Sequence, residues 1–421
     1  MNDKWRAYFN RQMMIVLTFG FSSGLPLMLV FGTLSLWLKD YNIAYSAIGA
    51  FSLVRLPYSF KWLWAPLVEN YKIPILYRLG KRRSWSLFAQ IGLFLSLSWL
   101  ACLKPSDGIL YMAMITLLVS FFSATQDIVL DAFRVELFEG NSEQEVKGAT
   151  IYVLGYRIGI IVSGAFAIGL AAYISWNMVY FINALLMFLG MAATFLSHEP
   201  ENIPIVEKQT PQQSIFRYAL VEPFIQFMKR PYWLVALLIV FTYRLSDAYF
   251  GPMAYPFYDD VGFSKLEIAY VTKIYGTIAT IVGGIVGGIF LAKIGLMRGL
   301  LWLAFVQGLT TALYIPLYYV GHSVWFLVFT ISFENLSLGM ATTAIIAFMS
   351  ILCDKGHTAT QYALLSSLMG AARDVLASTS GTVLEMTSWP IFFGISALLT
   401  LPGAALCYYL YKKKPSYIIN S

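Results

Sequence analysis

Long apolar stretches, each about 20 residues or more, recur along the whole chain and alternate with short polar segments. A stretch of this length crosses roughly 30 Å of hydrocarbon as an α-helix. The pattern therefore predicts an all-α polytopic membrane protein. Its twelve expected transmembrane helices cover residues 12–38, 47–69, 84–103, 109–135, 148–172, 176–197, 231–257, 264–291, 299–320, 324–352, 358–383 and 389–411.

One long polar interruption, from His198 to Arg230, divides these spans into six plus six. Two six-helix bundles joined by a long central loop are typical of the major facilitator fold. We therefore predict bundles over 1–197 and 231–411, a cytoplasmic central loop over 198–230 and a cytoplasmic tail over 412–421. In that loop, Ser214–Lys229 places apolar residues at helical spacing, which suits either an amphipathic helix on the membrane or a plain linker helix.

Composition narrows the class further. Hydrophobic residues make up 58% of the chain and charged residues 12%, about half of the roughly 25% usual for soluble domains. This excludes a water-soluble enzyme and a disordered chain. The net charge of +7 comes from basic residues in short loops, so it does not indicate nucleic-acid binding. The three cysteines are widely spaced and predict neither a disulfide framework nor a metal site.

The loop charges predict an orientation. With the N-terminus inside, the inner segments carry most of the loop Lys and Arg, and the outer loops carry only Lys39, Lys104 and Lys265. Both termini are therefore expected in the cytoplasm. The first apolar run follows Arg6 and Arg11, as in a signal peptide, but it is long and eleven more follow it. We interpret it as a retained first helix.

Charged residues inside the spans are the candidate functional groups. Each costs roughly 2.5–3.5 kcal/mol on insertion scales, so the chain must face them toward a bundle interior or a wet cavity. Basic residues outnumber acidic ones there, which suits an anionic substrate. The set is Arg55, Lys61, Arg134, Arg157, Arg244, Lys273 and Arg373 with Asp127, Asp131, Asp247, Glu334 and Asp374.

Position along each span suggests different roles. Arg157, Lys273 and Glu334 fall near the membrane midplane, and Asp127 in the inner half. Arg244 and Asp247 are three apart, so they either neutralise each other or act on substrate. Arg373 and Asp374 are adjacent and are expected to diverge around their helix and find different partners.

Gly20–Gly24 matches G-x-S-x-G, the pattern of a serine nucleophile turn. Here it lies inside a predicted helix, and His198, His322 and His357 all lie in or beside loops. The same residues also spell GxxxG, and Gly283–Gly288 contains two overlapping GxxxG spacings, both of which favour close helix packing. We therefore predict no enzyme activity.

Pro57 lies between Arg55 and Lys61 and predicts a distorted second span.

Several blocks together resemble the AmpG muropeptide permeases of Gram-negative bacteria, a branch of the major facilitator superfamily. They are Phe19–Leu27, Leu56–Leu67, Gly80–Trp85, Ala124–Leu137, Tyr152–Gly159 and Ala359–Ser367. The resemblance implies proton-driven import of anhydromuropeptides across the inner membrane, from periplasm to cytoplasm. The family block on the fourth span implies functional roles for Gln126, Asp127 and Asp131, and those on spans two and five for Lys61, Tyr156 and Arg157. Arg55, Glu69–Asn70 and Arg373–Asp374 depart from the family pattern.

The predicted roles fall into three groups. Substrate-binding candidates are Lys61, Gln126, Tyr156, Arg157, Lys273, Asn335, Gln361 and Arg373. Asp127 or Glu334 would carry the coupling proton, and Asp131, Arg134, Lys81, Arg82 and Arg83 would form the inner gate. For Gln126, Tyr156, Asn335 and Gln361, an ordinary interhelical hydrogen bond is an equal alternative.

We expect a monomer in the lipid bilayer with no metal or organic cofactor. The alternatives are transport of another organic anion, such as an acyl-coenzyme A or a sugar phosphate, and a non-transporting scaffold or signalling protein.

Overall fold

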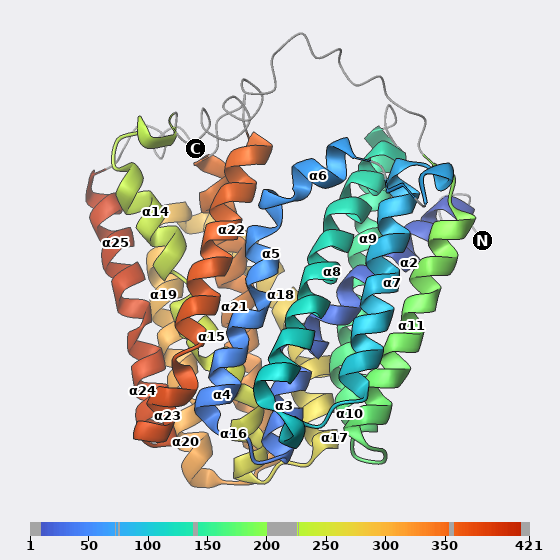
Figure 1. Cartoon of the computed structure of the whole chain (residues 1–421). Helices are drawn as coiled ribbons and strands as arrows, with labels where there is room; N and C mark the ends of the chain where they lie inside the picture. The colour runs from blue at the N-terminus through green and yellow to red at the C-terminus, as the bar shows by residue number, and fades with distance from the viewer. Residues whose placement is uncertain are drawn as a thin grey trace, which may run out of the picture. The chain divides into compact units, whose positions relative to one another are not determined.

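A computed structural model of the chain describes residues 10–71, 73–74, 76–137, 142–199, 225, 227–352 and 358–413. Within these ranges the chain is helical, with no β-strand, as the apolar pattern predicts (Figure 1). It divides into two compact units. Unit 1 comprises Met1–Ile43 and Phe51–Ile203, and unit 2 comprises Ala44–Ala50 and Pro204–Ser421. A short segment early in the chain is thus grouped with the later unit.

Ten described helical segments are long and apolar enough to cross a membrane. In unit 1 these are Arg11–Asp40, Lys81–Ala101, Ile109–Arg134, Thr150–Leu170 and Trp176–Leu196. In unit 2 they are Trp233–Val261, Lys265–Ile294, Leu296–Val320, Val324–Met349 and Trp389–Lys413. Each overlaps one of the predicted spans. The two remaining predicted spans, 47–69 and 358–383, do not form single long apolar helices among the described residues.

The second predicted span is broken, as Pro57 led us to expect. It consists of α4 (Tyr45–Ala50), η1 (Phe51–Arg55), α5 (Leu56–Phe60), η2 (Lys61–Leu63) and α6 (Ala65–Asn70). Pro57 and Pro66 both lie in the first turns of their helices, where a missing N–H costs nothing. The eleventh predicted span is α22 (Thr358–Ala377) followed by α23 (Ser380–Met386), and α22 carries the charged pair Arg373–Asp374.

Unit 1 contains two sets of closely packed helices. Helices α7 (Lys81–Ala101), α8 (Ile109–Leu137) and α11 (Trp176–Leu196) lie side by side, and α2 (Arg11–Leu29) packs along α9 (Ser142–Ile161) (Figure 1). Two shorter helices, α3 (Gly32–Asp40) and α10 (Ala167–Leu170), complete the membrane-spanning segments that α2 and α9 begin. A core of Met13, Val16, Phe19, Leu130 and Phe133 joins α2 to α8.

Glycines allow the backbones of α2 and α9 to approach each other closely. A Cβ at Gly20 would lie 2.0 Å from the Tyr152 carbonyl oxygen, and one at Gly24 would lie 2.2 Å from that of Tyr156. On the facing helix, a Cβ at Gly155 would lie 2.0 Å from the Leu17 oxygen. The GxxxG interpretation of Gly20–Gly24 is therefore confirmed, because no side chain fits between these backbones.

Unit 2 is assembled in the same way. Its remaining helices are α14 (Trp233–Thr242), α15 (Leu245–Phe250), α16 (Ala254–Val261), α17 (Lys265–Glu267), α18 (Gly276–Ile294), α19 (Leu296–Ala312), α20 (Tyr314–Val320), α21 (Val324–Ile351), α24 (Trp389–Leu398) and α25 (Thr400–Lys413). Helix α18 packs closely on α21, where Cβ atoms at Gly283 and Gly287 would clash with Leu336 and Met340. Gly288 instead faces open space.

Among the residues that the structure describes, a wide π-helical turn interrupts one helix in each unit. Val162–Phe166 lies between α9 and α10, and Ile268–Tyr275 lies between α17 and α18. Such turns are rare and are frequently found at functional sites. The second of them carries Lys273, one of the predicted substrate-binding residues.

Candidate functional site

Unit 1 gathers predicted site residues around Asp127 of α8. The Asp127 carboxylate accepts a hydrogen bond from the Ser23 hydroxyl of α2. The Lys61 ammonium of η2 lies close enough to interact with both Asp127 and Asp131. Asp127 and Lys61 are half-buried, whereas Asp131, one turn along α8, is exposed. We call Ser23, Lys61, Asp127 and Asp131 the α8 acidic cluster.

Tyr156 and Arg157 of α9 border this cluster. The Tyr156 hydroxyl lies within electrostatic range of Asp127 and Asp131, and also of Arg157 and Arg55. Arg157 is exposed and Tyr156 is half-buried. The structure therefore brings together four of the residues that sequence reasoning selected in unit 1: Lys61, Asp127, Asp131 and Tyr156. Cations beside two carboxylates can bind an anionic ligand while the carboxylates exchange protons.

Gln126 lies on a different face of α8 and is fully buried. Its Nε2 donates to the Ser22 carbonyl oxygen at 2.8 Å, and its Oε1 accepts from the Ser22 hydroxyl at 3.0 Å. These bonds satisfy both ends of the amide and join α8 to α2. The geometry favours the interhelical alternative for this residue over substrate contact.

The predicted inner-gate residues are held within unit 1. Arg82 is buried, and its Nε donates to Glu136 at 2.9 Å. The Glu199 carboxylate accepts from the Arg82 and Arg83 backbone N–H groups at 2.7 and 3.0 Å, which caps the start of α7. Arg83 Nε also donates to the Thr194 carbonyl oxygen at 3.0 Å. Half-buried Lys81 begins the same helix.

Arg134, the last predicted gate residue, lies one turn beyond Asp131 on α8. Its guanidinium carbon is 5.3 Å from the centroid of the Tyr152 ring, and its charge acts on Asp131. Arg134 therefore links Asp131 of the α8 acidic cluster to Tyr152 of α9. Its role in gating stays a prediction.

Unit 2 has its own membrane-embedded carboxylate, Glu334 of α21. The Tyr314 hydroxyl of α20 hydrogen-bonds to Glu334, and the Tyr258 hydroxyl of α16 lies 2.9 Å from that of Tyr314. Both tyrosine side chains are buried, and Glu334 is half-buried. The chain of hydroxyls thus connects the carboxylate to two further helices. Sequence reasoning missed the two tyrosines, because aromatic residues are abundant throughout the spans and nothing singles these two out.

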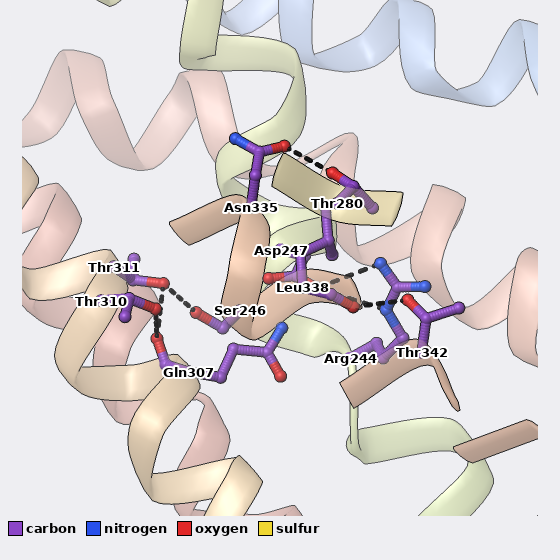
Figure 2. Close-up of polar contacts among 10 residues, drawn as sticks. All are labelled: Arg244, Ser246, Asp247, Thr280, Gln307, Thr310, Thr311, Asn335, Leu338 and Thr342. Atoms are coloured by element: carbon purple, nitrogen blue, oxygen red, sulfur yellow. Dashed lines mark hydrogen bonds and ion pairs between the residues drawn. The ribbon is translucent and has the colours of Figure 1, made fainter. Parts of the chain in front are cut away.

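Figure 2 shows polar contacts in the middle of unit 2. Arg244 Nε and Nη2 both donate to Asp247 Oδ2 at 3.2 Å, so the pair neutralises itself at the start of α15. Asn335 Oδ1 accepts from the Thr280 hydroxyl at 2.9 Å, which joins α21 to α18. Of the alternatives that the sequence left open, the geometry favours internal pairing for Arg244–Asp247 and an interhelical bond for Asn335.

The remaining predicted substrate residues have separate surroundings. Lys273 Nζ lies 4.5 Å from the centroid of the Tyr255 ring, a cation–π contact. Arg373 and Arg244 line a small shared cavity of about 20 Å³. Gln361 lies in the first turn of α22, but its side chain lies outside the described residues, as does most of the Ser214–Lys229 segment.

The expectation that Arg373 and Asp374 diverge around their helix is wrong, because the two side chains contact each other. Arg373 Nε lies 3.4 Å from Asp374 Oδ1, while Asp374 is buried and Arg373 remains partly exposed. The long arginine side chain folds back along the helix to reach its neighbour. Position around the helix fixes only the direction of the Cα–Cβ bond. The long, flexible arginine side chain can still bring its guanidinium to the carboxylate of the next residue.

Sequence reasoning also missed a cluster of polar residues around α4. Asp260 accepts hydrogen bonds from the Tyr45 hydroxyl and, at 3.0 Å, from Trp389 Nε1. Glu385 accepts from the Ser46 backbone N–H at 2.9 Å and from its hydroxyl at 3.0 Å. We call these five residues the α4 cluster. They lie at the ends of spans, so a search for charges inside the membrane does not find them.

Backbone packing reinforces the α4 cluster. A Cβ at Gly381 of α23 would lie 1.6 Å from the Tyr45 carbonyl oxygen, and one at Gly49 would lie 2.8 Å from the Gly381 nitrogen. Helices α4 and α23 therefore meet backbone to backbone. This contact explains why Ala44–Ala50 is grouped with unit 2 although the residues on both sides of it belong to unit 1.

Comparison with known proteins gives a consistent result. The sequence profile of the Major Facilitator Superfamily matches residues 16–375 and 236–420. The chain is 38% identical over 395 residues to the anhydromuropeptide permease of Escherichia coli K12, covering 93% of this chain and 78% of that protein. It is 36% identical over 398 residues to the putative transporter AmpG 4 of Rickettsia felis, covering 94% and 95%.

Solved transporters share the fold at low sequence identity. A peptide transporter POT in complex with sulfate superposes with a TM-score of 0.71 and 11% identity, over 96% of this chain and 95% of that one. The nucleoside transporter NupG superposes with a TM-score of 0.67 and 16% identity, over 98% and 100%. Together with the profile match and the two curated relatives, these results show that the chain is a multi-pass membrane transporter, not an enzyme, and belongs to the AmpG-type permeases of the major facilitator superfamily.

Proposed function

We propose that this protein imports anhydromuropeptides from the periplasm into the cytoplasm. The observation that carries the proposal is the 38% identity to a protein named anhydromuropeptide permease, over 93% of the chain. The chemistry of the site agrees, because a muropeptide carries several carboxylates and sugar hydroxyls. Lys61 and Arg157 in unit 1 and Lys273 and Arg373 in unit 2 are our candidates for binding those carboxylates.

The transport is proposed to be proton symport, with Asp127 or Glu334 as the proton carrier. Both are half-buried carboxylates in long apolar helices, and each accepts a hydrogen bond from a hydroxyl of another helix. An intramembrane carboxylate of this kind is expensive to retain and marks proton relays in transporters. The loop charges support a cytoplasmic location for both termini, and we expect the working unit to be a monomer.

Alternating access needs a gate at each end. The capped start of α7, with Asp131 and Arg134, is our candidate for the inner gate. The α4 cluster is our candidate for the outer gate, because under the proposed orientation it lies toward the periplasm. Its hydrogen bonds and its glycine contact must break for α4 to leave α23.

The direct test is uptake of a labelled disaccharide-anhydromuropeptide by the purified protein in liposomes with an imposed proton gradient. We expect gradient-dependent uptake that excess unlabelled muropeptide abolishes and that a sugar phosphate or an acyl-coenzyme A leaves unchanged. Empty liposomes provide the background. If well-folded protein transports a sugar phosphate or an acyl-coenzyme A and not the muropeptide, the substrate assignment is wrong.

A further inference from the structure

A large cavity lies at one end of unit 2, and none of its described lining residues belongs to the candidate site. Its volume is about 580 Å³, within the range of small-molecule sites. It begins about 16 Å along α18 from Thr280, one of the polar residues in Figure 2. Its described lining comes from the ends of four helices, α18, α19, α21 and α25: Leu291, Ala292, Ile294, Gly295, Leu296, Met297, Arg298, Ala347, Ile351 and Tyr411.

The charged side chains at this cavity are all positive among the described residues. Arg298 is the charged residue of the described lining, and no carboxylate lines the cavity among the described residues. Arg298 Nε donates to the Tyr411 hydroxyl at 2.9 Å, which orients the guanidinium and leaves its two terminal nitrogens for another acceptor. Lys293 lies between two lining residues in sequence, and Lys412 and Lys413 directly follow Tyr411. All four basic side chains are exposed.

Two packed helices carry apolar stripes that end at these cations. On α19, Trp302, Phe305 and Leu309 are exposed on the same face as Arg298, at intervals of three or four residues. On α25, Leu401 and Tyr408 are exposed on the face that ends at Lys412, whose Nζ lies 4.7 Å from the Tyr408 ring. Each helix thus presents exposed apolar surface, then an aromatic ring, then a positive charge.

We propose that the cavity binds the headgroup of an anionic glycerophospholipid, with its acyl chains along the exposed faces of α19 and α25. The phosphate would accept hydrogen bonds from the Arg298 guanidinium, whose fork geometry suits phosphate oxygens. Lys412 would supply further positive charge at the level of the headgroup. Basic pockets between membrane helices bind anionic lipid headgroups by this combination of charge and apolar surface. The proposal is independent of the transported substrate.

The test uses the full chain, purified from its membrane and measured by native mass spectrometry and thermal unfolding. We expect phosphatidylglycerol to bind and raise the unfolding temperature, and phosphatidylcholine with the same acyl chains to do neither. The double variant Arg298→Gln/Lys412→Gln should weaken phosphatidylglycerol binding about tenfold or more. The matched control Lys39→Gln/Lys265→Gln removes the same charge from the predicted outer loops and should leave binding unchanged.

Three results would overturn the proposal. The first is equal binding of phosphatidylglycerol and phosphatidylcholine. The second is unchanged phosphatidylglycerol binding in a folded Arg298→Gln/Lys412→Gln variant. The third is displacement of the lipid by millimolar inorganic phosphate, which would make the cavity a site for a free anion. Arg298→Lys keeps the charge but loses the fork, so partial binding by this variant would support the phosphate contact.

Discussion

Ser23 and Tyr314 perform equivalent tasks at the two candidate proton carriers. Each donates a hydroxyl hydrogen bond from a neighbouring helix, to Asp127 in unit 1 and to Glu334 in unit 2. A hydrogen bond to an ionised group contributes about 1.5–3 kcal/mol, more than one between neutral groups. The hydrogen bond is therefore stronger when the carboxylate is ionised than when it is protonated. In this way the protonation state of the carboxylate affects how firmly the two helices are held together.

We predict that Ser23→Ala slows proton-driven uptake about tenfold, the equivalent of about 1.4 kcal/mol, because the ionised form of Asp127 loses its donor. Substrate counter-flow, in which the proton need not leave the carrier, should stay close to wild type. Ser23→Thr keeps the hydroxyl and should restore the uptake. Equal loss of uptake and counter-flow in Ser23→Ala would show that Ser23 only supports packing.

At the residue scale, sequence reasoning found charges better than it found their partners. Asp127, Lys61 and Glu334 could be selected because any charge inside an apolar span is costly and stands out. Tyr314 could not, since its hydroxyl becomes informative only when folding brings it to Glu334. Gln126 was selected as a substrate contact through the resemblance, whereas the folded chain engages both ends of its amide with Ser22.

At the scale of elements, the contact of α2 with α9 depends on the absence of side chains. A Cβ at Gly20 would lie 2.0 Å from a backbone oxygen, whereas a Cβ at Gly288 meets nothing within 4 Å. We predict that Gly20→Ala destabilises the protein by about 1–3 kcal/mol through overpacking. Gly288→Ala is the matched control and should be neutral or stabilising by up to about 1 kcal/mol, because alanine favours the helix.

The comparison is made by thermal unfolding of the purified proteins under identical conditions. Gly20→Ala should unfold at a lower temperature than wild type, and Gly288→Ala at the same or a higher temperature. Equal unfolding temperatures for the two variants would contradict the close backbone approach of α2 and α9.

The α4 cluster gives a second prediction at this scale. With Cys102, Cys353 and Cys407 replaced, Ser46→Cys and Glu385→Cys can be joined by a short, reducible thiol crosslinker. We expect the crosslink to stop uptake and a reductant to restore it, because α4 can then no longer leave α23. The two single-cysteine variants, treated with the same reagent, are the controls. Full transport by the crosslinked protein would show that α4 does not take part in gating.

The helical elements were largely predictable, but their grouping was not. Ten predicted spans coincide with long apolar helices because length and hydropathy determine a membrane helix locally. Pro57 correctly indicated a broken second span. The grouping of Ala44–Ala50 with unit 2 depends on contacts with residues more than two hundred positions away, such as Asp260 and Glu385. A local sequence pattern does not carry that information.

At the scale of the whole molecule, each unit contributes one candidate proton carrier and two candidate cations for the substrate. Membership in the AmpG-type permeases establishes transport, and the proposal adds that proton movement drives it. If that is correct, uptake of muropeptide must carry protons in the same direction, and the protons must pass through Asp127 or Glu334.

The most direct measurement is the internal pH of liposomes that contain the protein and a trapped pH-sensitive dye, after muropeptide is added outside. We predict that muropeptide acidifies the interior, and that Asp127→Asn or Glu334→Gln abolishes this acidification while counter-flow persists. Muropeptide uptake at the wild-type rate with no change in internal pH, or undiminished acidification in both variants, would contradict proton symport through these carboxylates.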